Sequence, residues 1–249
     1  MVNINNKQSK KTCVTIIKNN IKILSWNIQA SHSAIGNKFE DTDFTETINR
    51  HDFACLQETR QEVHLTGFRS ICNTRKDSKS GGVAILIKNE LIEGVEIIKN
   101  IKSSEFLICR LDKNFFKLSK DIYIINVYVK PQNSSSSTEL ENGRETLKQI
   151  EDLVNDLQKE GDVTLCGDFN ARIGLCSGLV EQDTNDHVPL PEDYEPDINS
   201  PRNSLDNITN TYGKLFLDVV KNNQLIILNG RTLGDLTGHF TSIQKMDVV

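Results

Sequence analysis

The sequence lacks the features that mark membrane, secreted and zinc-binding proteins. None of its apolar runs approaches the roughly 20 residues that a membrane-spanning helix needs, and the polar N-terminus has no apolar secretory signal. The six cysteines form no C-x-x-C pair and show no zinc spacing. We therefore expect an intracellular protein with reduced, mostly buried thiols and no membrane partner.

An excess of positive charge is also missing. The chain has 29 Lys and Arg against 34 Asp and Glu, a formal net charge of -5. Proteins that bind nucleic acid through overall basicity have the opposite balance, so the composition disfavours a histone-like or tail-type binder. An enzyme that binds DNA through a local patch is still compatible with this composition. Much of the acid lies in residues 175–200, a proline-containing stretch that we predict to be a surface loop.

Short apolar runs rich in β-branched residues predict strands, and longer amphipathic stretches predict helices. The predicted strands are residues 21–27, 53–57, 81–88, 105–111, 122–129, 163–170 and 224–229. The predicted helices are 43–50, 138–160 and 211–222. We expect a polar extension over residues 1–20 and one α/β domain over 21–249, built of two packed mixed sheets flanked by helices.

Polar side chains stand at or near the ends of several predicted strands. They are Asn27, Glu58, Tyr128, Asp168, Asn170 and Asn229. Any one of them is compatible with an ordinary role, such as a turn residue or a core tyrosine, and Asn229 fits a strand-end cap best. If the strands lie side by side, however, the other side chains converge in one cleft. On an extended backbone Asp168 and Asn170 would both face that cleft.

Carboxylates crowded into one cleft need a cation, a proton or a donor between them. Mg²⁺, with Mn²⁺ as a possible substitute, suits this set because it takes one or two protein carboxylates and fills its shell with water and phosphate oxygen. The chemistry that follows is phosphoester hydrolysis. The metal neutralises developing charge while a carboxylate orients and deprotonates the attacking water.

Five ordered motifs carry a resemblance: "LSWN", "LQE", "GGVAILI", "NVYVKP" and "GDFNARIG". They resemble the exonuclease, endonuclease and phosphatase superfamily. Two further stretches, "RNSLDNITNTYGKLFLDVV" and "LIILNGRTLGDLTGHFTS", are similar to the apurinic-type endonuclease domain of non-LTR retrotransposons. The resemblance covers about residues 21–242. It implies a four-layered α/β sandwich and a Mg²⁺-dependent endonuclease that nicks one DNA strand to prime reverse transcription.

The resemblance also implies roles for individual residues. Asn27 and Glu58 would bind the metal, Tyr128 would bond the scissile phosphate, and Asp168 would align or activate the water. Asn170 would orient Asp168 and contact the phosphate. Arg202, Asn210 and Thr241 would contact DNA. The implied partners are DNA and a reverse transcriptase domain of the full-length element, and we expect a monomer, located in the nucleus if functional and in the cytoplasm otherwise.

Members of the resembled family continue after the "FT" motif with an Asp on a strand and a Ser-Asp-His, whereas this sequence stops at Val249. We predict a C-terminally incomplete domain without its last strand or strands. Loss of a charge-stabilising group costs on the order of 10² to 10³ in rate, so we expect a weak or inactive nuclease. Two alternatives stay open: a non-catalytic remnant that binds DNA or a partner, and a phosphatase of small phosphoesters.

Overall fold

The computed structural model describes residues 20–33, 36–74, 81–98, 106–131, 137–179 and 201–241, with backbone only for 137–141. Nearly all of the predicted extension, most of the predicted acidic loop and the tail after Thr241 therefore lie outside the described residues.

Two four-stranded mixed sheets form the centre of the fold. The first has the order β1 (Ile23–Asn27), β4 (Phe53–Gln57), β6 (Val83–Lys88) and β5 (Phe68–Asn73). The second has the order β10 (Gly161–Asp168), β9 (Asp121–Tyr128), β8 (Phe106–Leu111) and β7 (Val95–Ile98). Each sheet contains one parallel pair, β1 with β4 and β9 with β10, and its other pairs are antiparallel. A short antiparallel pair, β2 (His32–Ser33) and β3 (Gly36–Asn37), lies apart from both.

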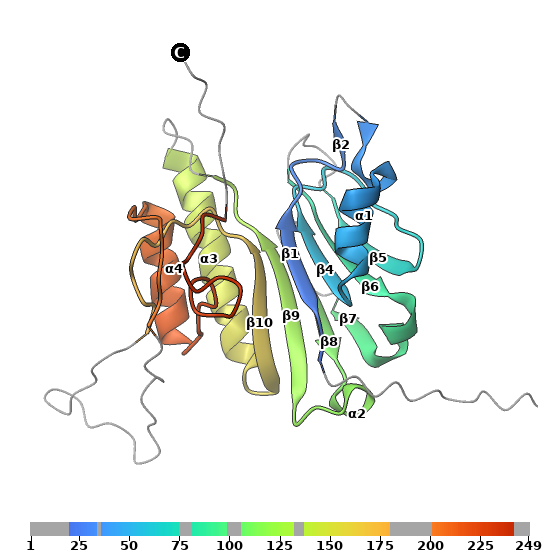
Figure 1. Ribbon diagram of the computed structural model, residues 1–249. Helices are drawn as coiled ribbons and strands as arrows, with labels where there is room; N and C mark the ends of the chain where they lie inside the picture. The colour runs from blue at the N-terminus through green and yellow to red at the C-terminus, as the bar shows by residue number, and fades with distance from the viewer. Residues whose placement is uncertain are drawn as a thin grey trace, which may run out of the picture.

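The sheets pack face to face because their central strands are apolar on both sides. In β4, Phe53 and Cys55 face the second sheet, and Ala54 and Leu56 face the opposite way. The helix α1 (Thr42–Asn49) covers the outer face of the first sheet, while α3 (Ser137–Leu157) and α4 (Thr211–Asn222) cover the second (Figure 1). The four layers confirm the predicted α/β sandwich of two mixed sheets flanked by helices.

The three predicted helices are confirmed, although α3 ends earlier than the predicted residue 160. Three short helical segments had no clear signal: η1 (Lys38–Glu40), η2 (Asn89–Gly94) and α2 (Lys113–Phe116). Among the described residues, no helix combines the length and apolarity required to cross a membrane.

The predicted strand at 224–229 is wrong, because the described residues 223–241 contain no strand. Ile226 and Leu228 are instead exposed, and no strand ladder pairs this segment with β10. An apolar run becomes a strand only where a neighbour satisfies its backbone groups, and the sequence of one segment does not report its neighbour. The strands β5 and β7 were not predicted; "FRSICN" mixes polar with apolar residues, and "VEII" is short.

Three of the cysteines lie in the layer between the sheets. Cys55 and Cys109 are buried, Cys166 is half-buried, and all three are free thiols. Burial raises the pKa of Cys109 to about 12, so this thiol stays protonated and behaves as a small apolar side chain. The predicted reduced thiols agree with this arrangement.

Candidate functional site

The two parallel strand pairs bring the predicted site residues together. Asn27 ends β1 opposite Gln57 of β4, and Glu58 is the next residue along. Tyr128 ends β9 opposite Asp168, the last residue of β10. The carboxyl ends of both pairs lie at one end of the sandwich, so residues from two different sheets line its opening.

Asn27 joins the two sheets by holding both carboxylates. Its Nδ2 donates to Glu58 Oε1 at 2.8 Å and to Asp168 Oδ2 at 2.7 Å. Its Oδ1 accepts from the backbone N–H of Gln29 at 3.0 Å, which fixes the orientation of the amide. Asn27, Glu58 and Asp168 are only half-buried, so the carboxylates can reach solvent and a substrate. The convergence predicted from the sequence is therefore present for these three residues.

A tight turn after β10 fixes the second oxygen of Asp168. The backbone N–H of Asn170 donates to Asp168 Oδ1 at 2.9 Å, and Asn170 Nδ2 donates to the carbonyl of Val129 at 2.7 Å. Asn170 has a φ of 49°, so the chain turns here, and the expectation of a continuing extended backbone is wrong. Asp168 and Asn170 nevertheless line the same cleft.

Gly167 permits the close approach of β10 to β9 just before the turn. Its φ is +147°, and a Cβ at this position would lie 2.1 Å from the carbonyl oxygen of Val127. No other residue fits such a contact without moving the strand. The glycine in "GDFN" therefore allows β10 to approach β9 closely directly before Asp168, the last residue of the strand.

Backbone strain is concentrated around the same opening. Gln29, Ala30, Glu58, Arg60 and Asn170 all have positive φ values, between 49° and 84°. The bond from Ala30 N to the Glu58 carbonyl, 2.7 Å long, ties two of these turns together. Left-handed conformations of non-glycine residues persist only where surrounding contacts enforce them, and they cluster at functional sites.

Two buried amides that the sequence interpretation did not single out connect the sheets beneath the site. Gln57 Nε2 donates to Asn126 Oδ1 at 2.6 Å, and Asn126 Nδ2 donates to the carbonyls of Leu56 and Ala84 at 3.0 and 2.8 Å. Both side chains are essentially inaccessible to solvent. Their position next to Glu58 and near Tyr128 fixes these residues relative to each other. The available signal was a polar residue inside an otherwise apolar strand.

The other predicted site residues occupy more varied surroundings. Tyr128 is buried, with 4% of its surface exposed, and does not belong to the residues that line the cleft. Thr241 is exposed and lines the same cleft as Asp168. Their roles toward phosphate and DNA stay predictions.

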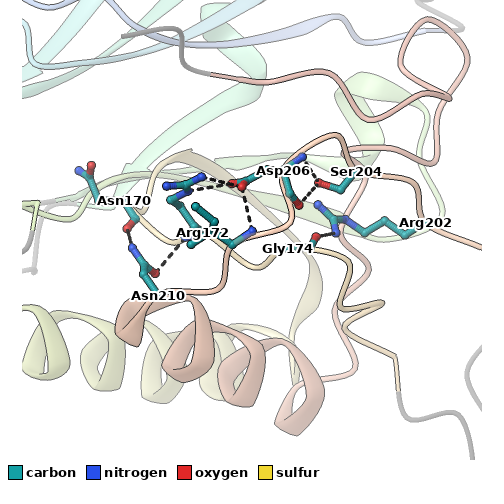
Figure 2. Close-up of polar contacts among 8 residues, drawn as sticks. Asn170, Arg172, Gly174, Arg202, Ser204, Asp206 and Asn210 are labelled. Carbon is teal, nitrogen blue, oxygen red and sulfur yellow. Dashed lines mark hydrogen bonds and ion pairs between the residues drawn. The ribbon is translucent and has the colours of Figure 1, made fainter. Parts of the chain in front are cut away.

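Arg202 and Asn210 bind the protein's own backbone. Arg202 Nη1 donates to the carbonyl of Gly174 (Figure 2). The same atom donates to the carbonyl of Cys176, and Nε donates to the carbonyl of Asn229. Burial, followed by the nearby Arg231, lowers the pKa of this guanidinium. Asn210 caps α4. The predicted DNA contacts of both residues stay untested, but each is in any case part of the loop structure.

An exposed ion pair lies beside these residues. Arg172 Nε and Nη2 donate to the two carboxylate oxygens of Asp206 at 2.9 and 2.6 Å (Figure 2). The hydrogen bond from Arg172 lowers the pKa of Asp206. The pair links the turn after β10 to the segment before α4, although the sequence motif "GDFNARIG" did not indicate a carboxylate partner for its arginine.

The donor set of the site suits a hard divalent cation. No group of three or more His, Cys, Asp or Glu residues within the described part of the chain could enclose a metal. Mg²⁺ does not require such a cage, because one or two carboxylates and several waters satisfy it. Glu58 and Asp168 supply two carboxylates that are held close by one amide. These residues therefore fit the cation that the sequence indicates.

The site opens into a large cleft. The cleft has a volume of about 2360 Å³ and includes Asn27, Asp168, Asn170 and Arg172 among its walls. Pockets for small molecules usually measure roughly 300–1,000 Å³. The cleft is larger because it runs from Asn27 and Asp168 along β10 to Gly161.

Comparisons with solved structures give three examples of similar chains. The catalytic domain of Xenopus laevis APE2 is 19% identical with a TM-score of 0.49, and the match covers 67% of this chain and 62% of that one. An AP endonuclease from Archaeoglobus fulgidus is 22% identical with a TM-score of 0.42, over 64% and 62%. The endonuclease domain of TRAS1, a telomere-specific non-LTR retrotransposon, is 14% identical with a TM-score of 0.48, over 81% and 69%. The chain spans about three fifths of the length of the first two.

A family model gives the assignment. The model described as the Endonuclease/Exonuclease/phosphatase family matches residues 24–205, which is most of the 249-residue chain and contains the strand ends that carry Asn27, Glu58, Tyr128 and Asp168. Members of this family are hydrolases that act on phosphodiester bonds. The chain therefore belongs to the endonuclease, exonuclease and phosphatase family.

Proposed function

We propose that the chain is a Mg²⁺-dependent phosphodiesterase that nicks DNA. The observation that carries the proposal is the bridge made by Asn27, which holds a carboxylate from each sheet, Glu58 and Asp168. Asn27 and Asp168 also line one cleft. Two fixed carboxylates beside a turn stabilised by Asn170 are the groups that metal-assisted attack of water on a phosphodiester requires.

In this mechanism Glu58 and Asn27 would hold the cation, which neutralises charge on the scissile phosphate when bound. Asp168 accepts a proton from the attacking water. Its carboxylate is suited to this role because Asn27 and the Asn170 backbone N–H orient its two oxygens separately. Tyr128, at the end of β9, would donate its hydroxyl to a phosphate oxygen after a small movement toward the cleft.

Two observations favour DNA over a small phosphoester as the substrate. The cleft runs from Asn27 and Asp168 along β10 to Gly161, which leaves room for an extended polymer. The stretches at 202–220 and 225–242 resemble the endonuclease domains of non-LTR retrotransposons, so we propose that origin, with a reverse transcriptase domain as partner in the full-length element, a monomeric state and action in the nucleus. Because the chain has a net negative charge, local contacts rather than net charge would hold the DNA.

The test is nicking of supercoiled plasmid by purified protein in Mg²⁺ or Mn²⁺, with chelator as a blank. We expect Glu58→Gln and Asp168→Asn each to lower the rate constant by roughly 10² to 10⁴ without loss of folding. Glu46→Gln, at an exposed carboxylate on α1, is the matched control and should cut at the wild-type rate. Cleavage that survives both site substitutions would reject the proposal.

The second candidate function is DNA or partner binding without turnover. One observation favours it: the amide of Asn27 already donates to one oxygen of each carboxylate, and its own oxygen accepts from the Gln29 backbone N–H, so the Asn27 amide is already engaged in bonds within the protein. We expect a slow nuclease at best if these bonds persist in the presence of metal. DNA affinity measured in Ca²⁺, beside turnover in Mg²⁺, separates the two functions, and an inositol phosphate release assay tests the phosphatase alternative.

A further inference from the structure

We propose that Asn210 is a positioning residue, which acts by holding the turn that carries Asp168 and Asn170. The inference rests on the proposed function, because the turn matters only if Asp168 handles the attacking water. It assigns to Asn210 a task different from the DNA contact that the sequence motif implies.

Every polar group of Asn210 reaches either the turn or the first residues of α4. Its Oδ1 accepts from the backbone N–H groups of Gly213, at 2.7 Å, and Arg172, at 3.0 Å. Its own N–H donates to the carbonyl of Arg172 at 3.0 Å. Its Nδ2 donates to the carbonyl of Asn170 at 2.9 Å (Figure 2). One side chain therefore caps α4 and binds both Asn170 and Arg172 in the turn of residues 168–172, the catalytic turn.

Asn210 is linked through Asn170 to Asp168, the residue proposed to accept the proton of the attacking water. The N–H of Asn170 orients Asp168 Oδ1, and its side chain is bound to the carbonyl of Val129. Asn170 also has a left-handed φ of 49°, a conformation that relaxes unless its neighbours enforce it. The bond from Asn210 to the Asn170 carbonyl is one such restraint. Without it, the donor to Asp168 loses one of the bonds that hold it in place.

The helix α4, which Asn210 caps, is held in place by buried side chains. Tyr212, Val219 and Val220 of α4 are buried, and Tyr212 and Val219 belong to the core beneath the second sheet. The first turn of the helix also touches the catalytic turn directly. A Cβ on Gly213 would lie only 1.8 Å from the carbonyl oxygen of Arg172. A displacement of the turn therefore requires a displacement of α4, which is packed in the core. Asn210 joins the turn to that helix.

The geometry also leaves Asn210 little capacity to bind DNA. The two bonds at Oδ1 occupy the two lone pairs of a carboxamide oxygen, and one of the two N–H bonds of Nδ2 is used. A residue that contacted phosphate would instead keep its donors free toward the cleft. The side chain of Asn210 is bonded to the backbone of Asn170, Arg172 and Gly213.

Two substitutions separate the cap from the positioning bond. Asn210→Asp keeps both acceptor contacts but replaces the Nδ2 donor with a charged oxygen that faces the carbonyl of Asn170. Asn210→Ser keeps a capping oxygen on a shorter side chain and removes the Nδ2 donor without adding charge; all three residues are good N-caps. Asp112→Asn, the reverse exchange at the N-cap of α2, is the matched control remote from the cleft. Single-turnover plasmid nicking, DNA affinity in Ca²⁺, thermal unfolding and amide exchange over 168–172 are measured for all four proteins.

We expect both Asn210 variants to cut about 10- to 100-fold more slowly, the order expected for a displaced catalytic group. Amide exchange at Asn170 should quicken in both variants. The unfolding midpoint should stay close to that of the wild type, and the Ser variant should keep wild-type DNA affinity. The Asp112→Asn control should leave nicking and exchange unchanged.

Wild-type rate and exchange in both variants would overturn the inference. So would slower cutting by the Ser variant that is explained by weaker DNA binding, with exchange of the turn unaltered, because that result identifies a DNA contact. If the wild-type chain cuts no DNA, the proposed function fails, and the exchange measurement still decides whether Asn210 holds the turn.

Discussion

The two-sheet sandwich and the segment 201–241 are stabilised in different ways. In the sandwich, strand ladders pair the backbone, and apolar side chains fill three buried clusters. In the segment 201–241, α4 is the sole regular helix or strand element that the structure describes, and side chains such as Arg202 and Asn203 bind carbonyls in place of a ladder. The exposed large apolar residues among the described positions all lie at 175–240: Leu175, Leu205, Ile208, Ile226, Leu228, Leu233, Leu236 and Phe240.

The difference indicates how the site divides its tasks. The residues proposed for chemistry, Asn27, Glu58, Tyr128 and Asp168, stand on or next to sandwich strands, where packing fixes their backbone. The segment 201–241 supplies Asn210 and the exposed Thr241 to the same cleft. Regions with few buried contacts open locally at low free energy. We therefore expect the sandwich to fix the positions of the proposed catalytic residues. We expect the segment 201–241 to open locally more easily than the sandwich does.

The same substitution in the two regions gives the largest contrast in stability. Leu56 is fully buried in β4, whereas Leu233 is 93% exposed. Leu56→Ala should lower the free energy of unfolding by about 2–5 kcal/mol through lost burial and the cavity left behind. Leu233→Ala should change it by less than roughly 0.5 kcal/mol. Urea unfolding measures both, and equal losses would contradict the division between the regions.

The buried amide pair can be broken within the sandwich alone. Asn126→Leu removes the donor to the carbonyls of Leu56 and Ala84 and one of the acceptors of Gln57 Nε2, which keeps the Cys55 carbonyl and Ser25 Oγ. A buried polar group left unsatisfied costs about 1–3 kcal/mol, so we expect a loss of at least that size. Asn203→Leu, which removes an exposed side-chain bond to the carbonyl of Leu236, is the comparison in the other region and should cost less. A larger loss of unfolding free energy in Asn203→Leu than in Asn126→Leu would contradict the view that buried polar bonds matter more in the sandwich than exposed bonds do in the segment 201–241.

Gly167→Ala tests the strand from which the catalytic turn leaves. The positive φ alone costs roughly 1–3 kcal/mol for a residue with a Cβ, and the 2.1 Å contact with the Val127 carbonyl adds a displacement of β10. We expect lower stability together with slower nicking. Gly36→Ala has a positive φ but nothing within 4 Å of its Cβ, so it isolates the conformational part. Equal effects of the two substitutions would show that the contact at Gly167 relaxes freely.

The ion pair between Arg172 and Asp206 should give the smallest effect, because its side chains are partly exposed. The folded pKa of Asp206 lies below its ordinary value, chiefly through the hydrogen bond from Arg172. Its contribution to stability is therefore complete above the unfolded pKa, roughly 3.9, and disappears as pH falls through the lower folded pKa. Asp206→Asn should be slightly less stable than the wild type at neutral pH. Unfolding curves from pH 2 to 7 should converge at the acid end; a constant difference would exclude the ion pair as its cause.

The sequence was most informative where a segment's own pattern decides its structure. Six of the seven apolar runs predicted as strands correspond to strands, because β-branched residues that are buried on both faces suit a sheet whatever its order. The polar strand ends predicted a shared opening, and the bridge from Asn27 to Glu58 and Asp168 agrees with that prediction. The run at 224–229 failed because pairing depends on a neighbour, and the turn at Asn170 failed because its left-handed backbone is imposed by surrounding bonds.

The amino-acid sequence by itself therefore determined the family, the α/β class and the side chains that stand at the strand ends, since these follow from local composition and motif order. The tertiary structure alone decided which groups bind one another. It paired Gln57 with Asn126 beneath the site and brought the side-chain amide of Asn210 to the carbonyl of Asn170. The physical reason is that a hydrogen bond between residues 40 positions apart depends on how sheets and helices pack, and no local pattern encodes that packing.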